Sequence, residues 1–391
     1  MTREEVTQHI RESPNTNFLL ILSTGFGKTR AALEILDKIE KFRFPVLIVV
    51  PRIVLIENWK KEILKFGFED HLDFITFTTY QSLHKHSGKN YGYVIYDECH
   101  HLSERCKALA LGVRSVYNCF LSATVKQDLE YWIKRYYENL EIIKVDLRKA
   151  IDNDVLPEPK VYLIPLQLND TFFTETLIRE SKNKKKWAAC FYSDRWKYLK
   201  DYNVKIKCTE QQYYNEISND IEYWKKMYMG NTFFKNKWLH LCGTRLKWLS
   251  DKKTEIILNL LKHLKNYRTL TFCNSIEQTE LLGKYCINSK NKLSGEYLNM
   301  FNNKKIKHIT SVNMLNEGCN LSDCRIGIFV SINSSEILVK QKNGRLLRHK
   351  EPVIIIPYYI NTREEELVKQ MLENYNPELV STITKFEDIV L

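Results

Sequence analysis

The sequence has no cysteine pair at C-x-x-C spacing and no histidine and cysteine cluster at the spacing of a zinc site, although its 391 residues include ten cysteines. Scattered cysteines are typical of free thiols in a reducing compartment, which argues against a disulfide scaffold or a structural zinc module. Its longest apolar runs, such as 18–22 and 353–357, fall far short of the roughly 20 residues that a membrane-spanning helix needs. The polar start MTREEVTQ lacks the form of a secretion signal. We therefore expect a cytoplasmic protein without membrane contact.

The sequence also lacks internal repeats and low-complexity tracts. It is 44% hydrophobic, which is enough to bury the cores of two or three domains. The formal net charge of +12 is spread over the chain and favours a polyanionic partner, nucleic acid above all. A basic protein of no particular affinity explains the charge equally well. Frequent Asn, Lys and Ile suit an AT-rich genome, and the compact build is compatible with a phage or a virus.

Residues 18–150 alternate short apolar runs with segments of helical periodicity, and a second alternation of similar length begins at residue 254. The predicted strands are 18–22, 44–51, 73–80, 91–97, 117–123, 141–147, 307–312, 325–332 and 351–360, with further strands near 161–168 and 268–274. The predicted helices are 28–42, 56–66, 254–266, 275–288 and 335–348. Apolar strands that alternate with helices predict parallel α/β sheets covered on both faces. Two such halves, 1–148 and 149–391, would enclose a cleft at the carboxyl ends of their strands.

An accessory insertion is expected at about 170–240. Residues 182–207 hold nine Lys and Arg against two acids, with aromatic residues between them. Such a surface suits phosphates and unpaired bases, and the candidate contacts are Lys184, Lys185, Lys186, Trp187 and Trp196. A small packed module with solvated lysines is an equally good interpretation. The next segment, 210–229, has helical spacing and is predicted to be a packing helix.

The stretch STGFGKT, residues 23–29, follows an apolar strand and opens a predicted helix, which is the context of a phosphate loop. Leu22 stands where the full pattern has its first glycine. Gly25 and Gly27 would let backbone N–H groups approach phosphate, Lys28 would supply a cation, and Thr29 would offer a hydroxyl to Mg²⁺. A glycine-rich turn with an exposed lysine is the alternative for this stretch alone.

The segment YVIYDECHH places Asp97 and Glu98 at the carboxyl end of another strand. Asp97 would hold Mg²⁺ through water, and Glu98 would orient or deprotonate the attacking water. His100 suits a relay to the other half of the chain. Buried acids that cap a loop are the alternative, which is less favoured because a phosphate loop precedes this pair in the same half.

The ordered segments STGFGKT, DECH and LSAT (121–124) resemble motifs I, II and III of the superfamily 2 helicases and translocases. The resemblance continues with VVPRIVLIENWKKEI (motif Ia), TTYQSL, LTFCNS (IV), SVNMLNEGCNLSDCR (V) and QKNGRLLR (VI), and spans nearly the whole chain outside 170–240. In motif V, Asn320 replaces the Asp of many relatives. The family implies two tandem RecA-like domains with an ATP cleft between them.

The resemblance also implies site residues. The hydrolytic residues would be Lys28, Asp97, Glu98, Gln341, Arg345 and Arg348, the last two as arginine fingers, with Mg²⁺ held by Thr29 and Asp97. The ATP contacts would be Ser23, Thr24, Gly25, Phe26, Gly27, Lys28, Thr29, Arg30 and Gly318. Gln8 or Arg3 would contact the base of the nucleotide. Coupling would involve His100, Ser122, Ala123 and Thr124. Nucleic-acid contacts would include Pro51, Arg52, Thr79, Asn274 and Ser311.

The branch of the superfamily bears on the substrate. The motif Ia and motif IV surroundings resemble restriction-enzyme motor subunits, XPB-like translocases and phage recombination helicases, which act mainly on duplex or branched DNA. The DECH form also occurs in RNA helicases, so RNA stays open. We expect a monomeric, ATP- and Mg²⁺-dependent motor on duplex, forked or branched DNA. The alternative is a nucleic-acid-activated ATPase that acts as a sensor or regulatory subunit without unwinding.

Overall fold

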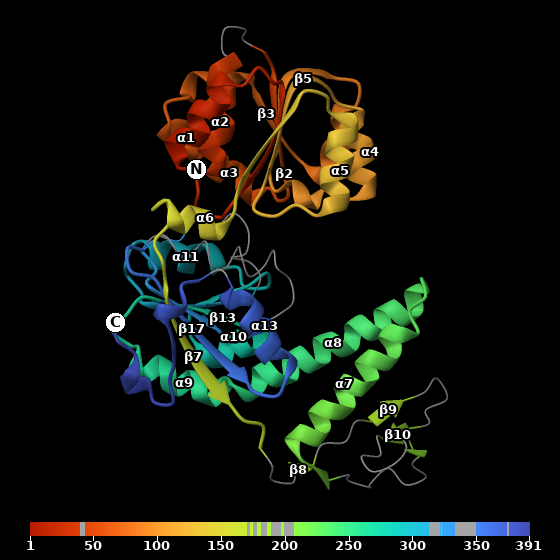
Figure 1. Ribbon diagram of the computed structural model, residues 1–391, viewed down its shortest axis with the longest axis vertical. Coiled ribbons are helices and arrows are strands. Elements are labelled where there is room, and N and C mark those ends of the chain that lie inside the picture. Colours follow the sequence, from red (N-terminus) through yellow and green to blue (C-terminus); the bar gives the residue numbers. More distant parts are fainter. Residues whose placement is uncertain are drawn as a thin grey trace.

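The structure is a computed structural model of the 391-residue chain. The structure describes residues 1–39, 44–169, 209–312, 321, 323–332, 349–373 and 375–391, together with the backbone of short strands between 170 and 208. Two sheets, one above the other in Figure 1, organise the two halves of the chain. Among the described helices, none has the length and apolar character required to span a membrane.

The N-terminal half is built on a six-stranded sheet of order β3-β2-β4-β5-β1-β6. All of its strand pairs are parallel. Its strands are β1 (Asn17–Leu22), β2 (Val46–Val50), β3 (Ile75–Thr79), β4 (Asn90–Tyr96), β5 (Arg114–Ser122) and β6 (Leu140–Val145). These match the six strands predicted from the sequence.

Helices cover both faces of this sheet, with α1, α2 and α3 on one side and α4 and α5 on the other (Figure 1). Their bounds are α1 (Arg3–Glu12), α2 (Lys28–Ile39), α3 (Val54–Lys65), α4 (Glu104–Leu111) and α5 (Gln127–Tyr136), with 3-10 helices η1 (Glu69–Phe74), η2 (Tyr80–His86) and η3 (Cys99–His101). Alternate residues of β1 explain the two layers. Phe18 and Leu20 pack on the α2 side and Leu19 and Ile21 on the other, since successive strand side chains face opposite ways.

Helix α1 was not anticipated from the sequence. Thr2 begins it with a capping box, in which the Thr2 side chain accepts from the Glu5 N–H and the Glu5 carboxylate accepts from the Thr2 N–H. Val6 and Ile10 bury one side of the helix. This capping stabilises a helix whose other faces are charged.

The C-terminal half is built on a seven-stranded sheet of order β14-β15-β13-β16-β17-β7-β18, again parallel throughout. Its strands are β7 (Lys160–Leu166), β13 (Thr269–Phe272), β14 (Cys286–Ile287), β15 (His308–Ser311), β16 (Ile326–Phe329), β17 (Val353–Tyr359) and β18 (Val380–Thr382). Strand β7, early in the sequence, lies between β17 and β18 near the C-terminus. The α/β class with two tandem RecA-like sheets is thus confirmed.

Helices of the second half include α9 (Thr254–His263), α10 (Ile276–Leu282), α11 (Ser294–Asn302) and α13 (Arg363–Leu372), with η5 (Pro377–Leu379) and η6 (Phe386–Asp388). The predicted helix 275–288 is wrong in its last part. Helix α10 ends before Gly283, a poor helix former, and Cys286–Ile287 instead forms strand β14 against β15.

Helix α6 (Leu147–Asp152) joins the two halves. Leu147, Ala150, Ile151 and Leu156 are buried in a hydrophobic cluster that also contains core residues of both sheets. The connection is therefore packed against both halves.

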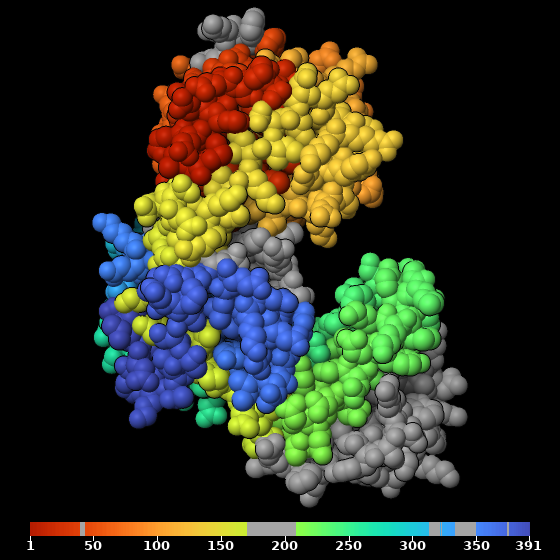
Figure 2. Space-filling view, viewed as in Figure 1, coloured from red at the N-terminus to blue at the C-terminus, as the bar shows by residue number. Residues whose placement is uncertain are grey.

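Between β7 and α9 the chain forms the short strands β8 (Phe173–Thr174), β9 (Ile178–Glu180), β10 (Lys186–Ala188), β11 (Lys197–Tyr198) and β12 (Lys207–Cys208), then helices α7 (Glu210–Lys226) and α8 (Thr232–Lys252). We call α7 and α8 the arm. Its helices pack through Tyr213, Ile217 and Ile221, which confirms the predicted packing helix. The expected end of the insertion at residue 240 falls inside α8. Figure 2 shows the arm beside the C-terminal half, with its tip directed toward the N-terminal half and open space between the tip and that half.

A buried ion pair holds the base of the arm. Lys253, at the junction of α8 and α9, donates to Glu364 Oε1 of α13 at 2.6 Å and to the Val330 carbonyl at 2.8 Å. The side chains are 0% and 2% exposed. Burial lowers the pKa of Lys253, and Glu364 opposes this shift only in part.

Candidate active site

The loop between β1 and α2 has the backbone conformation that its two glycines permit. Gly25 and Gly27 have φ values of 92° and 113°, a region that residues with a Cβ rarely adopt. The space beside Gly27 is open, so its φ, not crowding, requires glycine. Lys28 then begins α2. The first N–H groups of a helix lack intrahelical partners, so the end of this loop can receive an anion.

Buried hydroxyls beside the loop indicate that a polar ligand fits there. Ser23 Oγ and Thr24 Oγ1 are buried and have no hydrogen-bond partner within the described part of the chain. Such atoms are uncommon and call for an explanation. Thr29, half-buried in the first turn of α2, adds a third hydroxyl. Phosphate oxygens and a hydrated Mg²⁺ ion would both suit this set of donors and acceptors.

The acidic pair at the end of β4 lies next to the phosphate-loop lysine. Lys28 Nζ donates to Glu98 Oε1 at 2.6 Å, with side chains 12% and 14% exposed. Glu98 has a φ of 48°, an uncommon conformation for a residue other than glycine that is often found at functional sites. Burial, and then the nearby Glu98 charge, raise the pKa of Asp97 to about 6, while Lys28 and an indole hydrogen bond from Trp59 oppose the rise.

The coupling residues expected from the sequence meet at the ends of β4 and β5. His100 Nδ1 lies 3.0 Å from Ser122 Oγ and 3.4 Å from Glu98 Oε2. Ser122 Oγ donates to the Thr124 carbonyl at 2.7 Å, and Ala123 completes the same turn. His100 Nδ1 therefore lies between the Glu98 carboxylate and the Ser122 hydroxyl at the end of β5.

Two of the proposed ATP contacts point elsewhere. Arg30 pairs with the buried Glu34 and lies over the rings of Phe66 and Phe68. Gln8 is exposed and donates to Glu12 within α1 at 2.8 Å. These contacts turn both side chains away from the phosphate loop.

Arg3 does reach the phosphate loop from α1. Its Nε donates to the Phe26 carbonyl at 2.8 Å and its Nη2 to the Gly25 carbonyl at 3.1 Å. A longer contact of 3.4 Å joins Nη2 to the Val155 carbonyl in the segment after α6. Arg3 thus ties the loop to the connection between the two halves.

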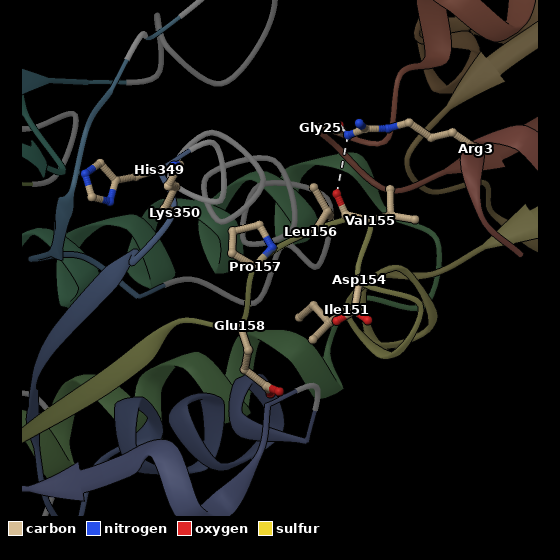
Figure 3. A pocket seen from close by; sticks show the side chains of 10 residues that line it. All are labelled: Arg3, Gly25, Ile151, Asp154, Val155, Leu156, Pro157, Glu158, His349 and Lys350. Atoms are coloured by element: carbon tan, nitrogen blue, oxygen red, sulfur yellow. Dashed lines mark hydrogen bonds between the residues drawn. The ribbon is translucent and has the colours of Figure 1, made fainter.

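A pocket of about 590 Å³ lies beside the loop, on the side of Arg3. Figure 3 shows side chains from both halves around it: Arg3, Gly25, Ile151, Asp154, Val155, Leu156, Pro157, Glu158, His349 and Lys350. Lys28 and Glu98 do not line it. The pocket thus adjoins the phosphate loop. It is also lined by His349 and Lys350, which directly follow the expected motif VI.

The nucleic-acid candidates have different settings. Pro51 and Arg52 follow β2 and Thr79 ends β3, at the same sheet edge as Asp97. Asn274 follows β13, and its side chain accepts from Ser331 at 3.4 Å. Ser311 ends β15 but is only 1% exposed, so it presents almost no surface. Lys186 and Trp187 lie in β10, described by its backbone, and the candidates outside the described residues are Lys184, Lys185, Trp196, Gly318, Gln341, Arg345 and Arg348.

Two residues at the site were not expected from the sequence. Trp59 Nε1 donates to Asp97 Oδ2 at 2.8 Å, and Tyr80 Oη donates to the Asp97 carbonyl at 2.8 Å. Both lie in the segments that resemble motif Ia and the motif TTYQSL, which the sequence does not connect with the ATP site. Their sequence spacing from Asp97 carries no signal, because the contacts exist only once β2, β3 and β4 are side by side.

Two parallel α/β sheets, with a phosphate loop and an acidic pair at one strand edge of the first, are the arrangement of a phosphate-loop nucleoside triphosphatase. The chain belongs to helicase superfamily 2. Residues 2–127 match the family described as "Type III restriction enzyme, res subunit", and residues 252–350 match the "Helicase conserved C-terminal domain".

Individual relatives are distant. The DNA 3'-5' translocase XPB2 of Sulfurisphaera tokodaii is 24% identical over 359 residues, which cover 85% of this chain and 75% of that protein. The Hef helicase domain of Pyrococcus furiosus has a TM-score of 0.53 at 14% identity, covering 94% of this chain and 97% of that one. S. cerevisiae Dbp5 bound to RNA and ADP BeF3 has a TM-score of 0.59 at 9% identity, covering 97% and 88%. The DNA-bound Type ISP restriction-modification enzyme LlaBIII has a TM-score of 0.57 at 14% identity, and this chain covers 31% of it.

Proposed function

We propose that this protein is a DNA translocase that moves on, and separates, duplex, forked or branched DNA. The class, an ATP-dependent helicase or translocase, follows from the family. The choice of DNA is supported by the printed name of the XPB2 relative, a DNA 3'-5' translocase, and by the basic charge of the chain, +12. RNA, which occupies the similarly folded Dbp5, is the competing track.

The observation that carries the hydrolytic part of the proposal is the contact between Lys28 and Glu98. At 2.6 Å the Lys28 ammonium and the Glu98 carboxylate form a charge-assisted hydrogen bond with each other. Binding of a nucleotide phosphate to Lys28 would release Glu98, which could then orient and deprotonate a water molecule. His100 would sense this release, because it contacts both Glu98 and Ser122.

We assign the metal site to Thr29 and Asp97. A bound Mg²⁺ ion supplies charge neutralisation to the phosphates. Asp97 is already oriented by its neighbours, and Ser23 and Thr24 offer the same ligand hydroxyls that have no hydrogen-bond partner among the described residues. Arg3 holds the loop carbonyls from the other side, so we assign it, in place of Gln8, to the nucleotide end of α1.

The second half would complete the site when the halves close. We propose domains 1–148 and 149–391, with Gln341, Arg345 and Arg348 facing the nucleotide from the second. His349, the residue after Arg348, lines the same pocket as Gly25, which supports this assignment. An arginine finger stabilises the transition state only when the two halves meet, so hydrolysis would follow closure.

The arm is proposed as an additional nucleic-acid contact. Its tip exposes Met229 (97%) and Phe233 (64%), and Lys237 lies 4.1 Å from the ring of Trp224. Aromatic and apolar groups beside lysines suit unpaired bases and phosphates. The tip stands apart from the N-terminal half (Figure 2), where a strand could pass.

The test is ATPase stimulation by single-stranded DNA, duplex DNA, forked DNA and RNA side by side, followed by strand displacement on a labelled fork with either overhang. We expect forked or duplex DNA to stimulate most, and displacement to require ATP. Lys28→Ala should abolish both activities, whereas Lys134→Ala, whose exposed side chain pairs with Glu130 within α5, should leave them unchanged. Stimulation by RNA alone would reassign the track, and hydrolysis without displacement or translocation would identify a sensor ATPase.

A further inference from the structure

Asp97 is held by three hydrogen bonds from three different elements. Its N–H donates to the Val49 carbonyl of β2 at 2.9 Å. Its carboxylate accepts from Trp59 of α3, and its carbonyl accepts from Tyr80 of η2, each at 2.8 Å. Trp59 and Tyr80 are 3% and 4% exposed. Trp59 therefore orients the Asp97 carboxylate, while Tyr80 and Val49 hold the Asp97 main chain.

Each aromatic donor belongs to a segment that adjoins a nucleic-acid candidate. Pro51 and Arg52 lie just before Ile53, the N-cap of α3, whose first residue, Val54, is 59% exposed. Thr79 immediately precedes Tyr80 at the start of η2. A shift of either segment on binding nucleic acid would therefore act directly on Asp97.

The chemistry of the two donors makes these contacts directional. An indole has a single N–H group, and Trp59 is packed in the hydrophobic cluster under α2 and α3, so its ring has little freedom to turn. The half-buried Asp97 carboxylate would have to reorient, or leave an oxygen without this donor, if the Trp59 contact were lost. Hydrogen bonds of this kind to metal-holding side chains typically tune metal affinity.

We propose that Trp59 and Tyr80 are positioning residues that orient Asp97 for Mg²⁺ and transmit nucleic-acid binding at α3 and η2 to the metal site. The inference rests on the proposed function for the identity of the track and of the metal. The relay makes binding at the two sites thermodynamically linked: DNA tightens Mg²⁺-dependent nucleotide binding, and the bound nucleotide tightens DNA binding by the same factor.

The experiment measures binding, not turnover. Directly excited fluorescent ADP (mant-ADP) is titrated against the full-length protein over a range of Mg²⁺ concentrations, with and without a saturating forked DNA. For the wild type we expect DNA to lower the half-saturating Mg²⁺ concentration by about fivefold or more. Trp59→Phe keeps an aromatic ring but removes the N–H. Without DNA, this variant should raise the half-saturating Mg²⁺ concentration about tenfold. DNA should then lower that concentration by less than twofold.

Trp132→Phe is the matched control, since Trp132 lies on α5 of the same half; it should titrate like the wild type. Tyr80→Phe is a second, independent variant that removes only the hydroxyl, and should reduce the effect of DNA in the same direction. If both Trp59→Phe and Tyr80→Phe match Trp132→Phe, the positioning role is refuted. If the wild-type protein binds forked DNA and its half-saturating Mg²⁺ concentration does not change, the relay is refuted while the DNA proposal stands.

Failure of the proposed function looks different. In that case the wild type binds no DNA, and the transmission of DNA binding is refuted with it. The titrations without DNA still decide whether Trp59 orients Asp97. A half-saturating Mg²⁺ concentration about tenfold higher in Trp59→Phe supports that role, and an unchanged concentration refutes it.

Discussion

Replacing Lys253 with methionine should strongly destabilise the protein. Methionine fills a similar volume but leaves Glu364, 2% exposed, without its cation, and the Val330 carbonyl without its donor. Removing one partner of a buried ion pair costs about 3–5 kcal/mol. For a domain of this size such a loss lowers the Tm by about 10 °C.

The double variant Lys253→Met/Glu364→Gln separates the cost of the unpaired Glu364 charge from the cost of the lost hydrogen bonds. A glutamine at 364 keeps an oxygen for the Tyr359 N–H, which donates to Glu364 Oε2 at 3.0 Å, and removes the buried negative charge. Burial lowers the pKa of Lys253, and the Glu364 charge offsets this cost of desolvating the lysine only in part. We therefore expect the double variant to recover at least about 2 kcal/mol of the loss.

The assay is urea unfolding followed by circular dichroism and by tryptophan fluorescence. Lys252→Met is the control, because the neighbouring lysine pairs with Glu210 at 2.7 Å in a more exposed setting, with side chains 24% and 16% exposed. Its loss should cost no more than about 1 kcal/mol. A cost below that value for Lys253→Met, or a double variant as unstable as the single one, would refute the reasoning.

Three further predictions concern the nucleotide site. Gly27→Ala places a Cβ on a residue with a φ of 113°, which costs about 1–3 kcal/mol. This variant should weaken nucleotide binding, measured by calorimetry, about tenfold. Gly243→Ala in helix α8, where a Cβ meets nothing within 4 Å, should leave nucleotide binding unchanged. Arg3→Ala should raise the KM for ATP about tenfold at an unchanged kcat, since charged hydrogen bonds contribute about 1.5–3 kcal/mol each; Gln8→Ala should have no effect, and equal KM values for the two would remove Arg3 from the site. Arg348→Ala should keep DNA binding by fluorescence anisotropy but lower kcat by about 10³ or more, and normal turnover would exclude a finger role.

Most of the fold could be predicted because strands that are buried on both faces are apolar throughout. The phosphate loop and the Asp97–Glu98 pair were also predictable, since their spacing along the chain is fixed by the strand–loop–helix unit that carries them. Strand β14 was missed because two residues, Cys286 and Ile287, carry too little pattern. Helix α1 was missed because its capping by Thr2 outweighs a weakly apolar sequence.

The side-chain contacts could not be predicted in the same way. Arg3 and Gln8 both lie on α1, and only the packing of this helix decides that Arg3 reaches Gly25. Trp59 meets Asp97 because β2 and β4 are neighbours in the sheet. Partners of this kind depend on strand order, which periodicity along the chain does not encode.

The position of β7 between β17 and β18 has a consequence for how the chain is made. Its partner β17 lies roughly 190 residues further on, so at a synthesis rate of about 5–20 residues per second β7 leaves the ribosome roughly 10–40 s before it. The N-terminal sheet, whose strands all lie before residue 146, can fold during this interval. The insertion and the arm emerge while β7 is still unpaired, with both of its edges open. Early release or truncation within the second half would thus leave an apolar strand exposed beside a folded ATP-binding domain, a natural target for chaperones.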